Sequence, residues 1–201
     1  MIRSIVMATS LTLCVGALQG CAGIVIAGAA GTAMVLHDRR DFSTQVDDTA
    51  LEMTVTHALA TNEGLKNQAR LRLFAVNRKI LAVGQVPSDF LKSEVDRIVR
   101  SEDGVTQFYN ELEIAEPIPF SIRSHDSWLS TKVRTALISD EEFDFTRVKI
   151  ITENGRIYLM GLVTQKEADM ATEITRKVSG VKEVVRVFEL VTEEEKQQVP
   201  H

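Results

Sequence analysis

The sequence predicts an α+β protein made of two copies of one small domain. An internal repeat aligns residues 45–114 with residues 124–191, so that Asp48 matches Asp126. Within each copy, apolar residues recur first at helical spacing and then at strand spacing. The composition, 44% hydrophobic and 25% charged over 201 residues, is sufficient for globular cores.

Each copy opens with a predicted helix, because four apolar residues fall on one helical face. They are Leu51, Val55, Ala58 and Leu59 in the first copy, and Leu129, Val133, Ala136 and Leu137 in the second. Asp48 and Asp126, or the hydroxyl residues directly after them, are expected to be the N-caps of these helices.

A hairpin of two strands is expected next. The strands are predicted over residues 71–75 and 80–84 in the first copy, and over 148–152 and 157–161 in the second. Asn154-Gly155 is a strong signal for a two-residue hairpin turn, and Asn77-Arg78 is a weaker version of it.

Gly84 and Gly161 end the outgoing strands of the two hairpins. A glycine at such a place predicts a bulge or the close approach of another backbone. We therefore assign both glycines to folding and expect valine at either position to destabilise its domain. The alternative is that the glycines form a ligand groove.

A second helix and a last strand complete each copy. The helices are predicted to start after Ser88 and after Thr164, which forms a capping box with Glu167. They end near Gly104 and Gly180, and the last strands follow over residues 105–114 and 181–191. Each copy therefore reads helix–strand–strand–helix–strand.

The first 20 residues are expected to be a lipoprotein signal peptide. Arg3 precedes an apolar run, residues 5–15, which is too short to span a bilayer. Leu18-Gln19-Gly20-Cys21 resembles a lipobox, so Cys21 is predicted to be the lipid anchor. The absence of Asp after Cys21 resembles the signal for the outer membrane, with the protein facing the periplasm. The alternative is an ordinary signal peptide that contains Cys21.

The remaining boundaries follow from composition. Residues 21–44 are predicted to be a lipidated apolar linker, and residues 115–123 a short linker around Pro117-Ile118-Pro119. Residues 192–201 read as a charged tail. The two folded units are thus predicted over residues 45–114 and 124–191.

The paired glycines, the Gly104-Val105 and Gly180-Val181 steps and the opening helices together resemble the BON family. Two copies behind a lipobox resemble the outer-membrane lipoproteins of that family. The resemblance implies two tandem BON domains, each with two helices packed on a three-stranded mixed sheet. It also implies no catalysis, binding of anionic phospholipid through the second domain, and a role in outer-membrane integrity and at the division septum.

The second opening helix has a distinctive outer face. Opposite its core residues lie four side chains of apolar or hydroxyl type, flanked by two cations. The strip consists of Trp128, Thr131, Thr135 and Ile138, and the cations are Lys132 and Arg134. An apolar strip with positive flanks suits anionic headgroups, and tryptophan favours the interfacial zone of a bilayer. The first copy has Ala50, Met53, His57 and Ala60 there, flanked by threonines.

We therefore predict that Trp128 inserts into lipid and that Lys132 and Arg134 contact headgroups, with Arg123 and His125 adding positive charge. In the alternative reading, Trp128 packs between the two domains and Ile138 packs against Phe143 or Phe145.

Other function classes are disfavoured. The formal charge of −5 argues against a nucleic-acid partner. The four histidines are scattered, and no catalytic or phosphate-loop motif occurs. We expect no enzyme activity, no metal, no cofactor and no small-molecule substrate.

The alternative to lipid binding is an adaptor for envelope proteins such as a protease, an amidase activator or the assembly machinery. A passive spacer is the third reading.

Overall fold

The computed structural model describes residues 42–66 and 68–192. The predicted signal peptide, Cys21 and most of the predicted apolar linker lie outside these residues, as does the predicted charged tail from residue 193. The first repeat contains α3 (Phe42–Ala60), α4 (Glu63–Lys66), β1 (Arg70–Val76), β2 (Lys79–Val86), α5 (Asp89–Ser101) and β3 (Gln107–Ile114). The second contains α6 (Phe120–Ile138), the 3-10 helix η2 (Phe145–Arg147), β4 (Lys149–Glu153), β5 (Arg156–Val163), α7 (Gln165–Arg176) and β6 (Glu183–Leu190).

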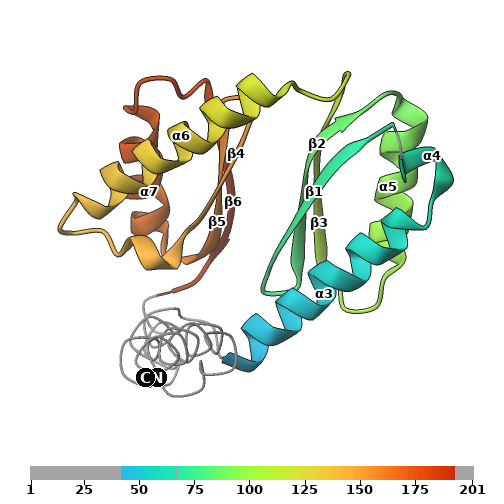
Figure 1. The fold of residues 1–201 in the computed structure, drawn as a ribbon. Helices are drawn as coiled ribbons and strands as arrows, with labels where there is room; N and C mark the ends of the chain where they lie inside the picture. The colour runs from blue at the N-terminus through green and yellow to red at the C-terminus, as the bar shows by residue number, and fades with distance from the viewer. Residues whose placement is uncertain (1–41, 67, 193–201) are drawn as a thin grey trace, which may run out of the picture. The chain divides into compact units, whose positions relative to one another are not determined.

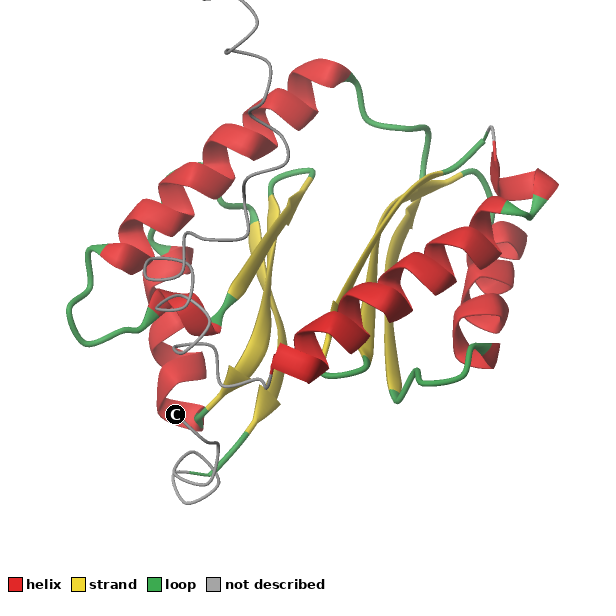
Figure 2. Ribbon diagram, turned by 60° about the horizontal axis from the view of Figure 1, so that its bottom comes forward, coloured by secondary structure: helices red, strands yellow, loops and turns green. Residues whose placement is uncertain are grey.

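Each repeat forms one mixed sheet of three strands. The central strand, β2 or β5, is antiparallel to the strand before it and parallel to the last strand of its repeat. The main helices of each repeat cover one face of its sheet (Figure 1; Figure 2). The predicted α+β class and the order αββαβ are therefore confirmed, with the short α4 and η2 as additions.

Two cores lie between the helices and the sheets. The predicted stripes are buried: Leu51, Val55 and Leu59 belong to the first core, and Leu129, Val133 and Leu137 to the second. Burial of each such side chain contributes about 1.5–3 kcal/mol, so these stripes fix the opening helices on their sheets.

The hairpins close as the sequence predicts. Two-residue turns connect the paired residues Val76 and Lys79 and the paired residues Glu153 and Arg156. Asn154 and Gly155 have φ values of 53° and 78°, the left-handed region that a type I′ turn requires. Asn77 and Arg78 adopt the same conformation, with φ values of 49° and 61°, although neither is glycine.

The predicted N-caps of the opening helices are wrong. The helices α3 and α6 begin six residues earlier, at Phe42 and Phe120, so Asp48 and Asp126 lie inside them. Both carboxylates are buried and bind the hairpin turn. Asp126 accepts hydrogen bonds from the backbone N–H groups of Asn154 (2.7 Å) and Gly155 (2.8 Å), and Asp48 does the same for the first turn.

The caps of the second helices agree with the sequence. The Ser88 side chain accepts a hydrogen bond from the N–H of Leu91 at the start of α5. Thr164 and Glu167 form the predicted capping box at the start of α7. Local spacing was sufficient here because a capping box involves only residues three apart in the sequence.

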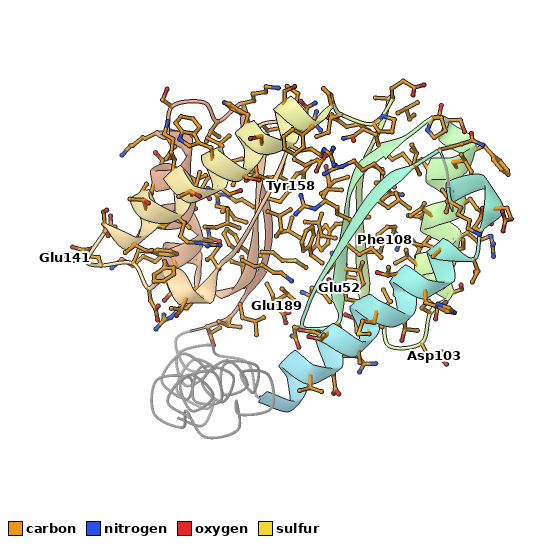
Figure 3. All side chains as sticks on the ribbon, viewed as in Figure 1. Glu52, Asp103, Phe108, Glu141, Tyr158 and Glu189 are labelled. Atoms are coloured by element: carbon orange, nitrogen blue, oxygen red, sulfur yellow. The ribbon has the colours of Figure 1, made fainter. Side chains whose placement is uncertain are left out.

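The second face of each sheet is also covered, because the two sheets share a cluster of buried side chains. Val76, Leu81 and Val83 from the first repeat pack with Ile151, Tyr158, Met160 and Val187 from the second. Figure 3 marks Tyr158 on the face of β5 that takes part in this cluster. The strands β2 and β5 are therefore apolar at nearly every position, as strands covered on both faces are.

Polar contacts around this cluster repeat with approximate two-fold symmetry. Asn77 donates to Glu189 (2.8 Å), and its counterpart Asn154 donates to Glu113 (3.2 Å). Lys79 pairs with Glu189, and Arg156 pairs with Glu113, both at 3.1 Å. In each domain, the asparagine of the hairpin turn and the cation two residues later thus contact a glutamate on the last strand of the other domain.

Candidate functional site

The outer face of α6 carries large apolar side chains that are exposed to solvent. Trp128 is 54% exposed and Ile138 is 51% exposed, whereas Leu129, Val133 and Leu137 on the opposite face are fully buried. The alternative that Trp128 packs between the domains is therefore wrong. Ile138 is likewise exposed, while Phe143 is buried in the second core.

Lys132 holds the indole in place. Its ammonium lies 4.4 Å from the centroid of the Trp128 ring, a cation–π contact. The same group donates a hydrogen bond to the backbone oxygen of Ser179 (2.6 Å), just beyond α7. The His125 ring lies 5.7 Å from the indole and is tilted by 50°. Lys132 thus bridges α6 to the segment after α7 and orients Trp128, in addition to carrying charge.

An open groove of about 490 Å³ adjoins the indole. Its lining combines four of the residues predicted from the sequence with three further ones: Trp128, Thr131, Lys132 and Thr135, together with Ala136, Val178 and Ser179. Arg134 and Ile138 are exposed on the same helix but do not line the groove. Helical spacing predicted four of the five α6 residues, but it placed Ala136 in the core stripe, whereas the structure has it half-buried in the groove wall. Val178 and Ser179 come from 40 or more residues further along the chain.

The exposed surface of α6 is positively charged, although the whole chain is acidic. Arg123, Lys132 and Arg134 lie along it, and its one carboxylate, Asp126, is buried against the hairpin turn. Within residues 42–66 and 68–192, Arg134 forms no ion pair. The helix therefore presents cations to solvent without compensating acidic groups of its own.

Phe120 was missed by the sequence analysis, which placed it in the linker. It is the first residue of α6 and is 74% exposed, with the Arg123 guanidinium 5.5 Å from its ring centroid. Its position directly after Pro119 was the available signal, since a helix often starts next to a proline. Phe120 adds a second exposed aromatic side chain to α6.

The corresponding face of α3 differs in charge and in aromatic content. Ala50, the counterpart of Trp128, is exposed, and so are Met53 and His57. This helix carries Asp47 and Glu52 but neither lysine nor arginine. An aromatic ridge with cations is thus a property of the second domain.

The two strand glycines mark close approaches of backbone. A Cβ on Gly84 would lie 1.9 Å from the carbonyl oxygen of Arg70, and one on Gly161 would lie 2.2 Å from that of Arg147. Strand pairing is continuous at Gly84, which faces Leu71, so the first strand contains no bulge there. This geometry supports the assignment of both glycines to folding, which stays a prediction.

The described part of the chain contains no group of three or more His, Cys, Asp or Glu residues placed to hold a metal ion. Among its helices, none combines the length and the apolar character needed to cross a bilayer. One strongly perturbed acid–base group occurs in it: burial raises the pKa of the Tyr158 hydroxyl to about 12. Tyr158 belongs to the cluster between the sheets and is remote from the groove.

Comparison with known proteins gives a consistent result. The chain is 40% identical over 171 residues to "Outer membrane lipoprotein DolP" of Haemophilus influenzae, covering 85% of this chain and 89% of that protein. It is 38% identical over 154 residues to a "21 kDa hemolysin" of Actinobacillus pleuropneumoniae, covering 77% and 79%. It is 25% identical over 142 residues to "Osmotically-inducible protein Y" of Escherichia coli, covering 69% and 70%.

The family model described as "BON domain" matches twice, over residues 47–116 and 125–192. These two matches contain both three-stranded sheets and the second helix of each repeat. The chain belongs to the BON domain family, of which it carries two tandem copies.

Proposed function

We propose that this protein is a non-enzymatic outer-membrane lipoprotein that binds anionic phospholipid through α6 of its second domain. Cys21 is the lipid anchor in this proposal, and the domains face the periplasm. The name of the Haemophilus influenzae relative, with which the chain shares 40% identity, supports the location and the lipoprotein class. The roles in envelope integrity and at the division septum rest on the family resemblance.

One observation carries the lipid-binding proposal. Trp128 is 54% exposed beside an open groove, with the Lys132 ammonium against its ring, and the first domain has Ala50 in its place. Tryptophan suits the boundary between headgroups and acyl chains because its ring is apolar and its N–H is polar. Phe120 and Ile138 extend the apolar contact to both ends of α6.

The energetics favour a two-signal mechanism. Each basic side chain near an anionic surface contributes about 1 kcal/mol, so Arg123 and Arg134 hold the domain only weakly by themselves. The acyl chains of Cys21 would keep the domain near the leaflet. The effective concentration of lipid around α6 is then high, so that α6 is bound to lipid for much of the time even though its own affinity is weak. The anchor then supplies residence in the membrane, and α6 supplies the preference for anionic lipid.

Vesicle cosedimentation tests this proposal. A soluble form with residues 37–201, which make up one compact unit, is mixed with phosphatidylglycerol or phosphatidylcholine vesicles. We expect selective pelleting with phosphatidylglycerol, reduced at least tenfold in affinity by Trp128→Glu. The matched control is Ala50→Glu, which adds the same charge at the equivalent exposed position of the first domain. We expect it to pellet like the parent.

The adaptor hypothesis is the second candidate, and the outer face of α3 favours it. Met53 is 68% exposed there, and Val46, two turns earlier, is also exposed. If Trp128→Glu pellets as well as the parent, lipid binding through α6 is rejected and this face of α3 becomes the surface to test against envelope proteins.

A further inference from the structure

A second, polar pocket lies on the other side of α6, where the two domains meet. It has a volume of about 180 Å³, well above the 10–15 Å³ that one water molecule needs. Its lining comes from β1 of the first domain and from α6 and β4 of the second: Arg70, Arg72, Arg123, Asp126, Ser127, Ser130 and Thr152. The pocket therefore combines three guanidinium groups with three hydroxyl groups.

The carboxylates near these arginines are already engaged. Both oxygens of Asp126 accept backbone N–H groups of the hairpin turn. The buried carboxylate of Glu153, next to Thr152, accepts hydrogen bonds from Arg70, from Arg72 (3.4 Å) and from Gln85 (2.8 Å). Three guanidinium charges minus these two carboxylates leave a net charge of +1.

The arginines retain donors for a further acceptor. A guanidinium has five N–H donors. Arg72 is 41% exposed on its side chain, and Arg123 is exposed at the start of α6. No carboxylate of the described residues pairs with the Arg123 guanidinium, which lies 5.5 Å from the centroid of the Phe120 ring.

The internal repeat indicates what the pocket accepts. Lys149 of the second domain is the counterpart of Arg72 and pairs with Glu52 of α3 (3.7 Å). Glu52, which Figure 3 labels, also accepts a hydrogen bond from the N–H of Ala75. In one half of the interface, then, a carboxylate from the opening helix of one domain meets the strand cation of the other.

In the other half, α6 has no carboxylate at the position equivalent to Glu52, and its one carboxylate, Asp126, is engaged by the hairpin turn. Ser130 is the counterpart of Glu52, and its hydroxyl donates to the hydroxyl of Thr152 (2.7 Å), the counterpart of Ala75. Arg72 donates to the carbonyl of the same Thr152 (3.1 Å). The helix, strand and cation are thus arranged as around Glu52, but the helix position is short and neutral. The carboxylate nearest Arg72 is instead Glu153 of the strand (3.4 Å), which Arg70 and Gln85 share.

We propose that this pocket binds one phosphate-type oxyanion, in the place that the Glu52 carboxylate occupies in the other half of the interface. Arg72 and Arg123 supply charge-assisted hydrogen bonds. The Ser127 hydroxyl, which donates to the backbone oxygen of Arg123 (3.0 Å), would turn toward the anion when it binds. Arginine suits this role because its planar N–H groups match the oxygens of a phosphate. The pocket shares no lining residue with the Trp128 groove, although Arg123 takes part in both proposals.

The test is thermal unfolding and calorimetric titration of the lipidated full chain in uncharged detergent. Inorganic phosphate is added against chloride at equal ionic strength. At a concentration ten times the Kd, we expect the unfolding midpoint to rise by about 3–5 °C. Arg123→Gln should weaken the affinity at least tenfold, since Arg123 is exposed and its loss leaves the core intact. Ser130→Glu should abolish the response, because it supplies the carboxylate internally.

Thr54→Glu is the matched control, because it adds the same charge at an exposed position of α3, outside the pocket and outside the Trp128 groove. It should respond to phosphate like the parent. The proposal is overturned if phosphate does not change the unfolding midpoint of the parent, or if Arg123→Gln retains the full response. Both outcomes can be read whether or not Ser130→Glu folds.

The phosphate group could belong to a lipid headgroup or to free inorganic phosphate. Glycerophosphoglycerol, a headgroup without acyl chains, distinguishes these two sources. Tighter binding than inorganic phosphate supports the site with a lipid headgroup as ligand. Weaker binding supports it with free phosphate as ligand. No vesicle is present, so failure of this test leaves the proposal for Trp128 standing.

Discussion

At the scale of single residues, the two cations that flank Trp128 on α6 differ in their contacts. Lys132 was expected only to contact headgroups, yet its ammonium is held between the Trp128 ring and the Ser179 carbonyl. It therefore fixes the indole against the groove. Arg134 is exposed and has no ion pair among the described residues, so its guanidinium is the freer cation of the two.

Gly84 gives the sharpest prediction at this scale. In Gly84→Val, the new Cβ would lie 1.9 Å from the Arg70 carbonyl oxygen, at a φ of 128° that residues with side chains avoid. We expect a loss of about 3 kcal/mol or more in the free energy of unfolding, measured by urea denaturation. A loss below about 1 kcal/mol would show that strand β1 moves aside easily.

At the scale of elements, the opening helices are tied to their hairpins by a buried carboxylate. Asp126 reaches the turn after β4, 28 residues along the chain, and Asp48 reaches the turn after β1. This contact explains how a hairpin with the poor turn residues Asn77 and Arg78 still forms. The backbone N–H groups of the turn bind the helix, which stabilises the left-handed conformation.

Asp126→Ala tests whether Asp126 binds the hairpin turn or acts as an N-cap, because the two roles predict different losses of stability. Loss of an N-cap costs about 1 kcal/mol, whereas the loss of a charged acceptor for two N–H groups costs about 3 kcal/mol. We expect the larger value by urea denaturation. Asp47→Ala is the control, an exposed position of α3 beside the equivalent aspartate, with an expected change within about 0.5 kcal/mol. Equal effects of the two substitutions would contradict the tertiary role.

At the scale of the whole molecule, the two domains share one buried interface, and Tyr158 lies in it. Burial raises the pKa of its hydroxyl to about 12, while the unfolded chain has a value near 10. Above pH 10 the unfolded chain releases this proton, but the folded protein retains it until about pH 12. The stability that the raised pKa contributes is therefore complete below pH 10 and is lost between pH 10 and 12.

The expected loss from Tyr158 is about 2–3 kcal/mol of unfolding free energy over that window. The measurement is urea denaturation at several pH values, for the parent and for Tyr158→Phe. All other titratable groups are common to both proteins, so the difference between the two curves isolates the Tyr158 hydroxyl. Parallel curves would show that Tyr158 ionises as freely in the folded protein as in the unfolded chain.

The sequence by itself determined the duplication, the order of helices and strands, the buried leucines and valines of the opening helices, and four of the five α6 residues of the Trp128 groove. These follow from spacings within one element, and periodicity and capping are local properties. Only the tertiary structure decided how Asp48 and Asp126 act, that Val178 and Ser179 complete the groove, and that Arg70 and Arg72 approach Ser130. Each of these contacts joins residues far apart in the chain, and their proximity depends on how the sheets and helices pack.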